Sequence, residues 1–216
     1  TTKTFIPKTK VLINADTPAE AEMGINLGAD GIGLCRTEHM LLSEDRLKLF
    51  QSLIIAENLE ERNVALEKIY PKLESDFSTL YKILNGLPIT IRLLDAPLHE
   101  FVPKDQDKME ESVNFIINLY PQLTKDEILR RFNRLEEVNP MLGHRGCRLA
   151  VTYPEILVMQ VTAITEAVIA CKRKRIDARP EIMIPLVGIQ EELKQLRKLA
   201  IETIDRVAKK ERYKGK

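Results

Sequence analysis

Short apolar runs alternate with helical patterns along most of this chain, and this alternation limits the possible folds more than any other feature. The runs that we expect to be strands cover residues 10–16, 30–36, 89–95 and 181–187. Each is followed, directly or after a loop, by a stretch whose apolar residues recur every three or four positions, as on one face of a helix. Strands joined by helices pair in parallel, so the sequence predicts a parallel sheet covered by helices.

Helix boundaries are predicted from Thr-x-x-Glu capping boxes, which occur at 17–20, 124–127 and 152–155. We expect one helix after Thr17, helical structure from Glu44 to Leu84, a helix from Ile156 to about Lys174, and a last helix over 189–210. The polar stretch 97–137 is predicted to be a helical insertion, and 139–151 a glycine-punctuated loop.

The length of the chain and the number of predicted strands together distinguish between α/β folds. A complete eight-stranded barrel takes about 250 residues, whereas here four strands and an insertion already occupy 216. We therefore predict an α/β fold that is the first half of a (β/α)₈ TIM barrel, with residues 1–216 as one domain. The chain begins on Thr rather than Met, from which we expect a piece excised from a longer protein.

Composition limits the class of partner. The 33 Lys and Arg residues nearly balance the 32 Asp and Glu residues, so no nucleic acid or anionic membrane surface is indicated. No uninterrupted apolar run approaches the roughly 18 residues of a membrane span. The three cysteines have no paired spacing and are expected to be free thiols in a cytoplasmic, reducing environment.

Two arginines are candidates for binding a ligand. Arg36 closes the second predicted strand, at the end where a barrel binds its ligands. Arg92 lies within the third strand on the same face as Thr90, so its guanidinium points either into the barrel lumen or under a helix. An unpaired buried guanidinium costs several kcal/mol, and arginine is well suited to grip a phosphate or carboxylate at two points. These arginines indicate an anion site. The alternative is internal ion pairing of Arg36 with Glu38 and of Arg92 with Asp95, and the spacing leaves it open.

Four long motifs carry a resemblance to a known family. They are "GIGLCRTEHM" (31–40), "TIRLLDAPLHEF" (90–101), "NPMLGHRGCRLAVTYPEI" (139–156) and "EIMIPLVG" (181–188). In this order they resemble the phosphoenolpyruvate/pyruvate-binding C-terminal domain of the pyruvate phosphate dikinase family. Phosphoenolpyruvate synthase and the phosphotransferase system's enzyme I share only the "GIGL-x-R-x-E" core and remain alternatives. One departure is Ala96, where the dikinase pattern usually has proline.

The resemblance implies an activity and roles for particular residues. The family interconverts ATP, phosphate and pyruvate with AMP, diphosphate and phosphoenolpyruvate, using Mg²⁺. By match, Arg36, Arg92 and Arg145 would bind the phosphoryl and carboxylate groups of phosphoenolpyruvate or pyruvate. Arg148 is the alternative to Arg145, and Glu38 and Asp95 are candidates for orienting the arginines. The implied partners are the phosphohistidine and nucleotide-binding domains of the parent protein, which as a full enzyme is expected to be a homodimer.

The remaining machinery of the family is absent from this sequence. Its magnesium ligands lie in "GTMIE" and "TNDL" strands and its proton donor in a "CGE" loop, and none of these motifs occurs here. We expect no metal ligands in this chain, no complete set of catalytic residues, and no activity of the chain alone. The cysteines are expected to be structural, and His39, His99 and His144 to support or pack rather than to carry phosphate. The competing hypothesis is a non-catalytic binding or assembly fragment with an open sheet edge.

Overall fold

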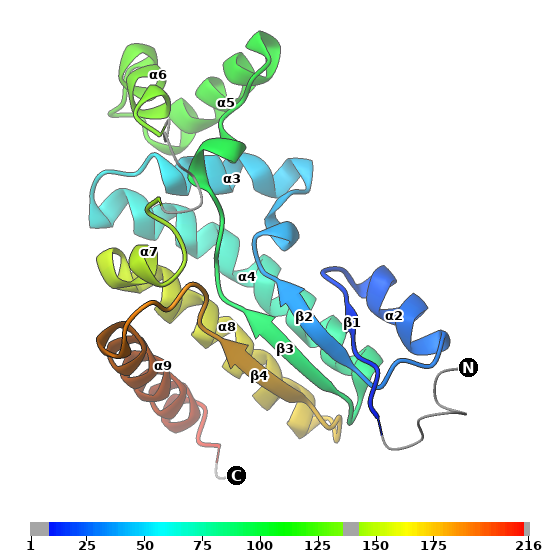
Figure 1. Cartoon of the computed structure of the whole chain (residues 1–216). Coiled ribbons are helices and arrows are strands. Elements are labelled where there is room, and N and C mark those ends of the chain that lie inside the picture. Colours follow the sequence, from blue (N-terminus) through cyan, green and yellow to red (C-terminus); the bar gives the residue numbers. More distant parts are fainter. Residues whose placement is uncertain (1–8, 136–142, 214–216) are drawn as a thin grey trace.

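The computed structural model describes residues 9–135 and 143–213, which form an α/β fold with one four-stranded parallel sheet. The strands follow one another across the sheet in chain order, as in part of a barrel (Figure 1). They are β1 (Ile13–Asn14), β2 (Ile32–Arg36), β3 (Pro88–Arg92) and β4 (Arg179–Met183). The predicted partial barrel is therefore confirmed, although each strand is shorter than predicted. The chain turns after β4 at Leu186, whose φ of 56° is incompatible with a strand.

Helices cover one face of the sheet. They are α2 (Pro18–Asn26), α4 (Leu59–Leu84), α8 (Pro154–Arg173) and α9 (Gln190–Lys210). The core between sheet and helices includes Ile32, Ile89 and Ile91 from the strands and Phe77 from α4, all fully buried. α4 packs most extensively on α8. By length and composition alone, α8 could span a membrane. However, 56% of its most apolar 18-residue stretch is buried inside the protein, as in the core helix of a folded domain.

The predicted helical structure from Glu44 to Leu84 is divided into two helices. α3 (Glu44–Ile54) ends before residues 55–58, and α4 starts after Asn58. The Asn58 side chain accepts a hydrogen bond from the backbone N–H of Glu61 at 2.8 Å. Asparagine is a strong N-cap because its side chain accepts a hydrogen bond from a backbone N–H that the helix leaves free. Asn58 therefore starts a new helix, although the apolar periodicity continues across the boundary.

Two of the predicted capping boxes are confirmed and one is wrong. Thr17 and Thr124 each accept from the N–H of the glutamate three residues later, and each glutamate reaches back to its cap. Thr152 instead ends a short helix, α7 (Cys147–Thr152), and its hydroxyl donates to the Arg148 carbonyl at 3.0 Å. Part of the loop predicted over 139–151 is therefore helical. Residues 139–142 lie outside the described part of the chain.

The described residues of the predicted insertion form η2 (Leu98–Phe101), α5 (Gln106–Leu119) and α6 (Lys125–Asn133). They have an apolar cluster of their own, whose fully buried members include Ile116, Ile128 and Phe132. A buried ion pair joins the insertion to α4, with Arg131 Nη1 2.7 Å from Glu61 Oε2. Figure 1 shows α3, α5 and α6 beyond the carboxyl ends of the strands. Residues 136 and 137 lie outside the described ranges.

Candidate functional site

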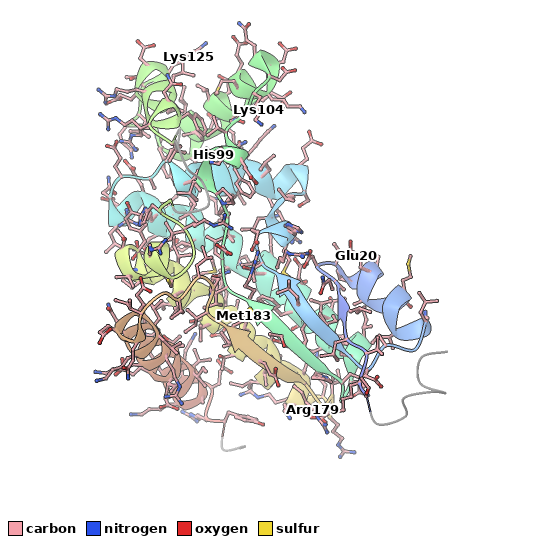
Figure 2. All side chains as sticks on the ribbon, viewed as in Figure 1. Glu20, His99, Lys104, Lys125, Arg179 and Met183 are labelled. Carbon is pink, nitrogen blue, oxygen red and sulfur yellow. The ribbon has the colours of Figure 1, made fainter. Side chains whose placement is uncertain are left out.

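The register of the sheet brings the two arginines of the predicted anion site together. β2 and β3 pair so that Arg36 lies opposite Arg92, and each is the last residue of its strand. Ile91 is fully buried toward the helices, and neighbouring side chains of a strand point to opposite faces. Arg92 therefore lies on the open face and not under a helix. Figure 2 shows Arg179 at the lower end of β4 and Met183 toward its upper, carboxyl end, which gives the direction of the strands.

Arg36 is held by Asp16, which follows β1. Asp16 Oδ1 accepts from the Arg36 backbone N–H at 2.6 Å, and Oδ2 lies 3.3 Å from Arg36 Nη1. His39 Nδ1 is 2.7 Å from the same Oδ2. The predicted alternative pairing of Arg36 with Glu38 is therefore wrong. The Asp16 carboxylate, which follows β1, lies beside the Arg36 backbone, whereas the Glu38 side chain contacts Arg92 at the end of β3.

Asp16 is a site residue that sequence reasoning missed. Its signal is an aspartate that ends the first predicted strand, the same position that Asp95 occupies in the third. Polar residues at the carboxyl ends of neighbouring parallel strands share one edge of a sheet, so the three strand ends could have been read together.

Arg92 lies between two buried carboxylates. Its Nη2 donates to Glu38 Oε1, and its Nη1 lies 3.4 Å from Asp95 Oδ2, so the predicted pair with Asp95 is present. The Glu38 and Asp95 side chains are only 7% and 4% exposed, against 21% for Arg92. Within the described part of the chain, Arg92 Nε and Glu38 Oε2 are buried with no hydrogen-bond partner. Buried polar atoms are nearly always paired, so these two are open positions of the cluster.

The third predicted arginine joins the same cluster. Arg145 Nε donates to Asp95 Oδ1 at 2.8 Å, and Nη2 donates to the Asp95 carbonyl at 2.9 Å. The next residue, Gly146, has φ 59°, and a Cβ there would lie 3.2 Å from Asp95 Oδ1. Glycine thus permits this close approach. Arg148 lies elsewhere, 42% exposed and 4.0 Å from Glu192, so Arg145 and not Arg148 lies beside Arg92.

Charge in this strand-end cluster is balanced. Three guanidinium groups contact three carboxylates. Arg36 contacts Asp16. Arg92 contacts Glu38 and Asp95, and Arg145 contacts Asp95. Each carboxylate contacts a guanidinium, and the described residues contain no group of three or more metal-ligating side chains.

Of the cysteines and histidines, His39 contacts the cluster, through the Asp16 carboxylate. All three thiols are free and buried, and burial raises the pKa of each. A buried thiol with a raised pKa is a poor nucleophile. His144 Nε2 lies 2.9 Å from the Thr152 hydroxyl. His99 lies in η2, at the start of the insertion, and is labelled in Figure 2.

Comparison with known proteins shows the family of the chain. A sequence profile described as "PEP-utilising enzyme, PEP-binding domain" matches residues 2–216. The chain belongs to this family. Among its relatives are pyruvate, phosphate dikinases of Treponema pallidum (strain Nichols; 46% identical) and Clostridium symbiosum (47%), and pyruvate, phosphate dikinase 2 of Oryza sativa subsp. japonica (47%). These alignments cover 90%, 93% and 95% of this chain respectively, but only 22% of each relative. This member of the PEP-binding family therefore spans about a fifth of the length of the relatives that it matches.

Proposed function

We propose that the chain is the segment of a pyruvate phosphate dikinase that holds the anion-binding arginines of the phosphoenolpyruvate/pyruvate site. The whole enzyme would interconvert ATP, phosphate and pyruvate with AMP, diphosphate and phosphoenolpyruvate. The observation that carries the proposal is the gathering of three arginines: Arg36 and Arg92 end adjacent parallel strands, and Arg145 reaches the same cluster from the loop before α7. The dikinase relatives favour this family over phosphoenolpyruvate synthase and enzyme I.

The arginines would grip the phosphoryl and carboxylate oxygens of the ligand. A guanidinium carries five donors, and the carboxylates around Arg92 leave its Nε unused. Glu38 and Asp95 hold the group in a fixed orientation, so that little reorganisation is needed when the anion arrives. Phosphoryl transfer depends mainly on such positioning and on neutralisation of charge.

The rest of the reaction would depend on residues outside this chain. We propose that the Mg²⁺ ligands, the proton donor, the phosphohistidine domain and the nucleotide-binding domain belong to other parts of a homodimeric, cytoplasmic parent protein. The chain alone is then expected to give no turnover in a coupled assay for pyruvate from phosphoenolpyruvate, AMP and diphosphate. Clear turnover would contradict the proposal that essential catalytic residues lie outside this chain.

Binding of oxalate, an enolate mimic, and of phosphoenolpyruvate tests the arginine site directly. Titration followed by NMR is expected to detect binding to the wild-type chain and its loss in Arg36→Ala and Arg92→Ala. Arg179→Ala is the matched control, because Arg179 is an exposed arginine at the opposite end of the sheet. Equal affinity in the wild type and all three variants would remove the arginines from the site.

A second candidate function is favoured by the exposed apolar side chains along the two sheet edges. Val11 and Leu12 lie beside β1, and Met183 and Val187 lie at and after β4, with 37% to 44% of each residue exposed. Such edges invite pairing with another chain. An assembly fragment would then form oligomers or bind a complementary half barrel. Light scattering after size exclusion checks this, and a compact monomer would count against it.

A further inference from the structure

One buried amide on α8 contacts the ends of two strands. Gln160 is only 2% exposed, although it is polar and lies on a helix of the core. Its Oε1 accepts a hydrogen bond from the backbone N–H of Leu94 at 3.1 Å. Its Nε2 donates to the Thr37 hydroxyl at 2.8 Å. A backbone N–H is only a donor, so the amide oxygen must face Leu94 and the orientation of the side chain is fixed.

The two contacts lie next to the arginines of the strand-end cluster. Thr37 stands between Arg36 and Glu38 in the chain, and Leu94 directly precedes Asp95. β2 and β3 have ended at this level. Among the described residues, the one direct backbone hydrogen bond between these two strands beyond their ends is long, 3.4 Å from Thr37 N to Arg92 O. The Gln160 side chain therefore bridges the two segments beyond the point where regular backbone hydrogen bonding between β2 and β3 ends.

Gln160 cannot itself meet a ligand of the proposed size. The cavity that it lines with Leu94 and Gly146 has a volume of about 10 Å³. That is about the space for one water molecule, far less than a three-carbon acid with a phosphoryl group needs. Any effect of Gln160 on ligand binding must therefore pass through the strand ends.

We propose that Gln160 is a positioning residue, which fixes the spacing between the carboxyl ends of β2 and β3 and thereby holds Arg36 and Arg92 in their paired arrangement. The inference rests on the proposed function for its link to ligand binding. An apolar residue of similar size would fill the same space, but it would leave the Leu94 N–H buried without an acceptor. The two strand ends would then relax independently, and the two arginines, which must bind the ligand together, would no longer be held at a fixed distance from each other.

Two pairs of variants test the proposal. Gln160→Met keeps the volume and removes both hydrogen bonds, whereas Ile169→Val perturbs the core of the same helix near its other end. Thr37→Val removes the acceptor of one bond, and Thr37→Ser keeps it, so the second pair remains informative if Gln160→Met does not fold. Measurements on the full chain are the NMR signals of the Arg36 and Arg92 Nε–H groups without ligand, and affinity for oxalate and phosphoenolpyruvate.

We expect Gln160→Met and Thr37→Val to shift both arginine signals, and Gln160→Met to weaken binding by about tenfold. Thr37→Ser and Ile169→Val should match the wild type in both measurements. Unchanged arginine signals in Gln160→Met and Thr37→Val, or unchanged affinity in both, would overturn the proposal. If the wild-type chain binds neither probe, the proposed function fails, but the arginine signals still decide whether Gln160 positions the strand ends.

Discussion

The replacement Arg92→Met tests how the buried carboxylates of the strand-end cluster are stabilised. In the wild type, Arg92 contacts both Glu38 and Asp95. Asp95 would keep its two hydrogen bonds from Arg145, but Glu38 Oε2 already lacks a partner in the described chain and Oε1 would lose its own. One nearly buried carboxylate would thus be left without a counter-charge.

The size of the effect follows from this count. Removing one partner of a buried ion pair costs about 3–5 kcal/mol. Because the Arg92 side chain is 21% exposed and Asp95 stays paired, we expect the low end, about 3 kcal/mol of unfolding free energy. Adding Glu38→Gln should restore about 1–2 kcal/mol, because a neutral amide is cheaper to bury than an unpaired charge. Arg148→Met is the control and should cost at most about 1 kcal/mol, since its contact is long and exposed.

Urea unfolding followed by far-UV circular dichroism measures these differences, since the chain has no tryptophan to report by fluorescence. The double variant Arg92→Met with Glu38→Gln also separates stability from binding: it should be partly restored in stability yet still fail to bind oxalate. A stability of Arg92→Met equal to the wild type, or no recovery on adding Glu38→Gln, would refute the reasoning about the buried carboxylate. Oxalate binding by the double variant would reduce Arg92 to an internal ion-pair partner.

Three further predictions concern parts of the fold around this cluster. Burial raises the pKa of Glu61, but hydrogen bonds from Arg131 and the Glu57 backbone, together with the charge of Arg131, outweigh it and hold the pKa below its ordinary 4.5. The resulting stability is present above pH 4.5 and lost as pH falls through the folded pKa, so the urea midpoint should decrease at pH values below about 4.5, and less so in Arg131→Met. Gly146→Ala should destabilise the chain by about 1–3 kcal/mol in the same assay, because φ is positive and the new Cβ would lie 3.2 Å from an Asp95 oxygen; an unchanged midpoint would show that the loop can relax. A thiol reagent should label almost nothing in the native chain and all three cysteines in urea, and rapid native labelling would mean that the core opens readily. The thiols concerned are those of Cys35, Cys147 and Cys171.

The alternation of strands and helices could be predicted because it depends on periodicity within short segments. Element ends were less predictable, since they depend on single caps and turns: Asn58 starts a new helix inside a continuous apolar pattern, and Leu186 turns the chain soon after β4. Thr152 had the spacing of a cap but lies at the end of a helix, where its hydroxyl bonds backward. Local pattern therefore gives the order of elements better than their limits.

The site shows the same division between local and long-range information. From the sequence, Arg36 could be placed at the end of its strand and Arg92 within the next strand, because each lies in its own strand motif; that β3 ends at Arg92 is seen only in the structure. The pairing of Arg92 with Asp95 could also be predicted, because the two residues lie three apart in one segment. Partners across strands could not, because they depend on register, and so Asp16 rather than Glu38 holds Arg36. Gln160 gave no signal at all: it lies more than 60 residues from either contact, and only the packing of α8 on the sheet brings it there.

The charge balance of the strand-end cluster affects how fast an anion can find it. Three guanidinium groups face as many carboxylates within one cluster, so their fields largely cancel at a distance. Long-range electrostatic steering needs a net local charge, and salt screens it beyond about 10 Å at 0.1 M. An anion would therefore arrive by unguided diffusion and be recognised only on contact. Its association rate should change little with ionic strength, in contrast to the steep dependence of sites with uncompensated arginines.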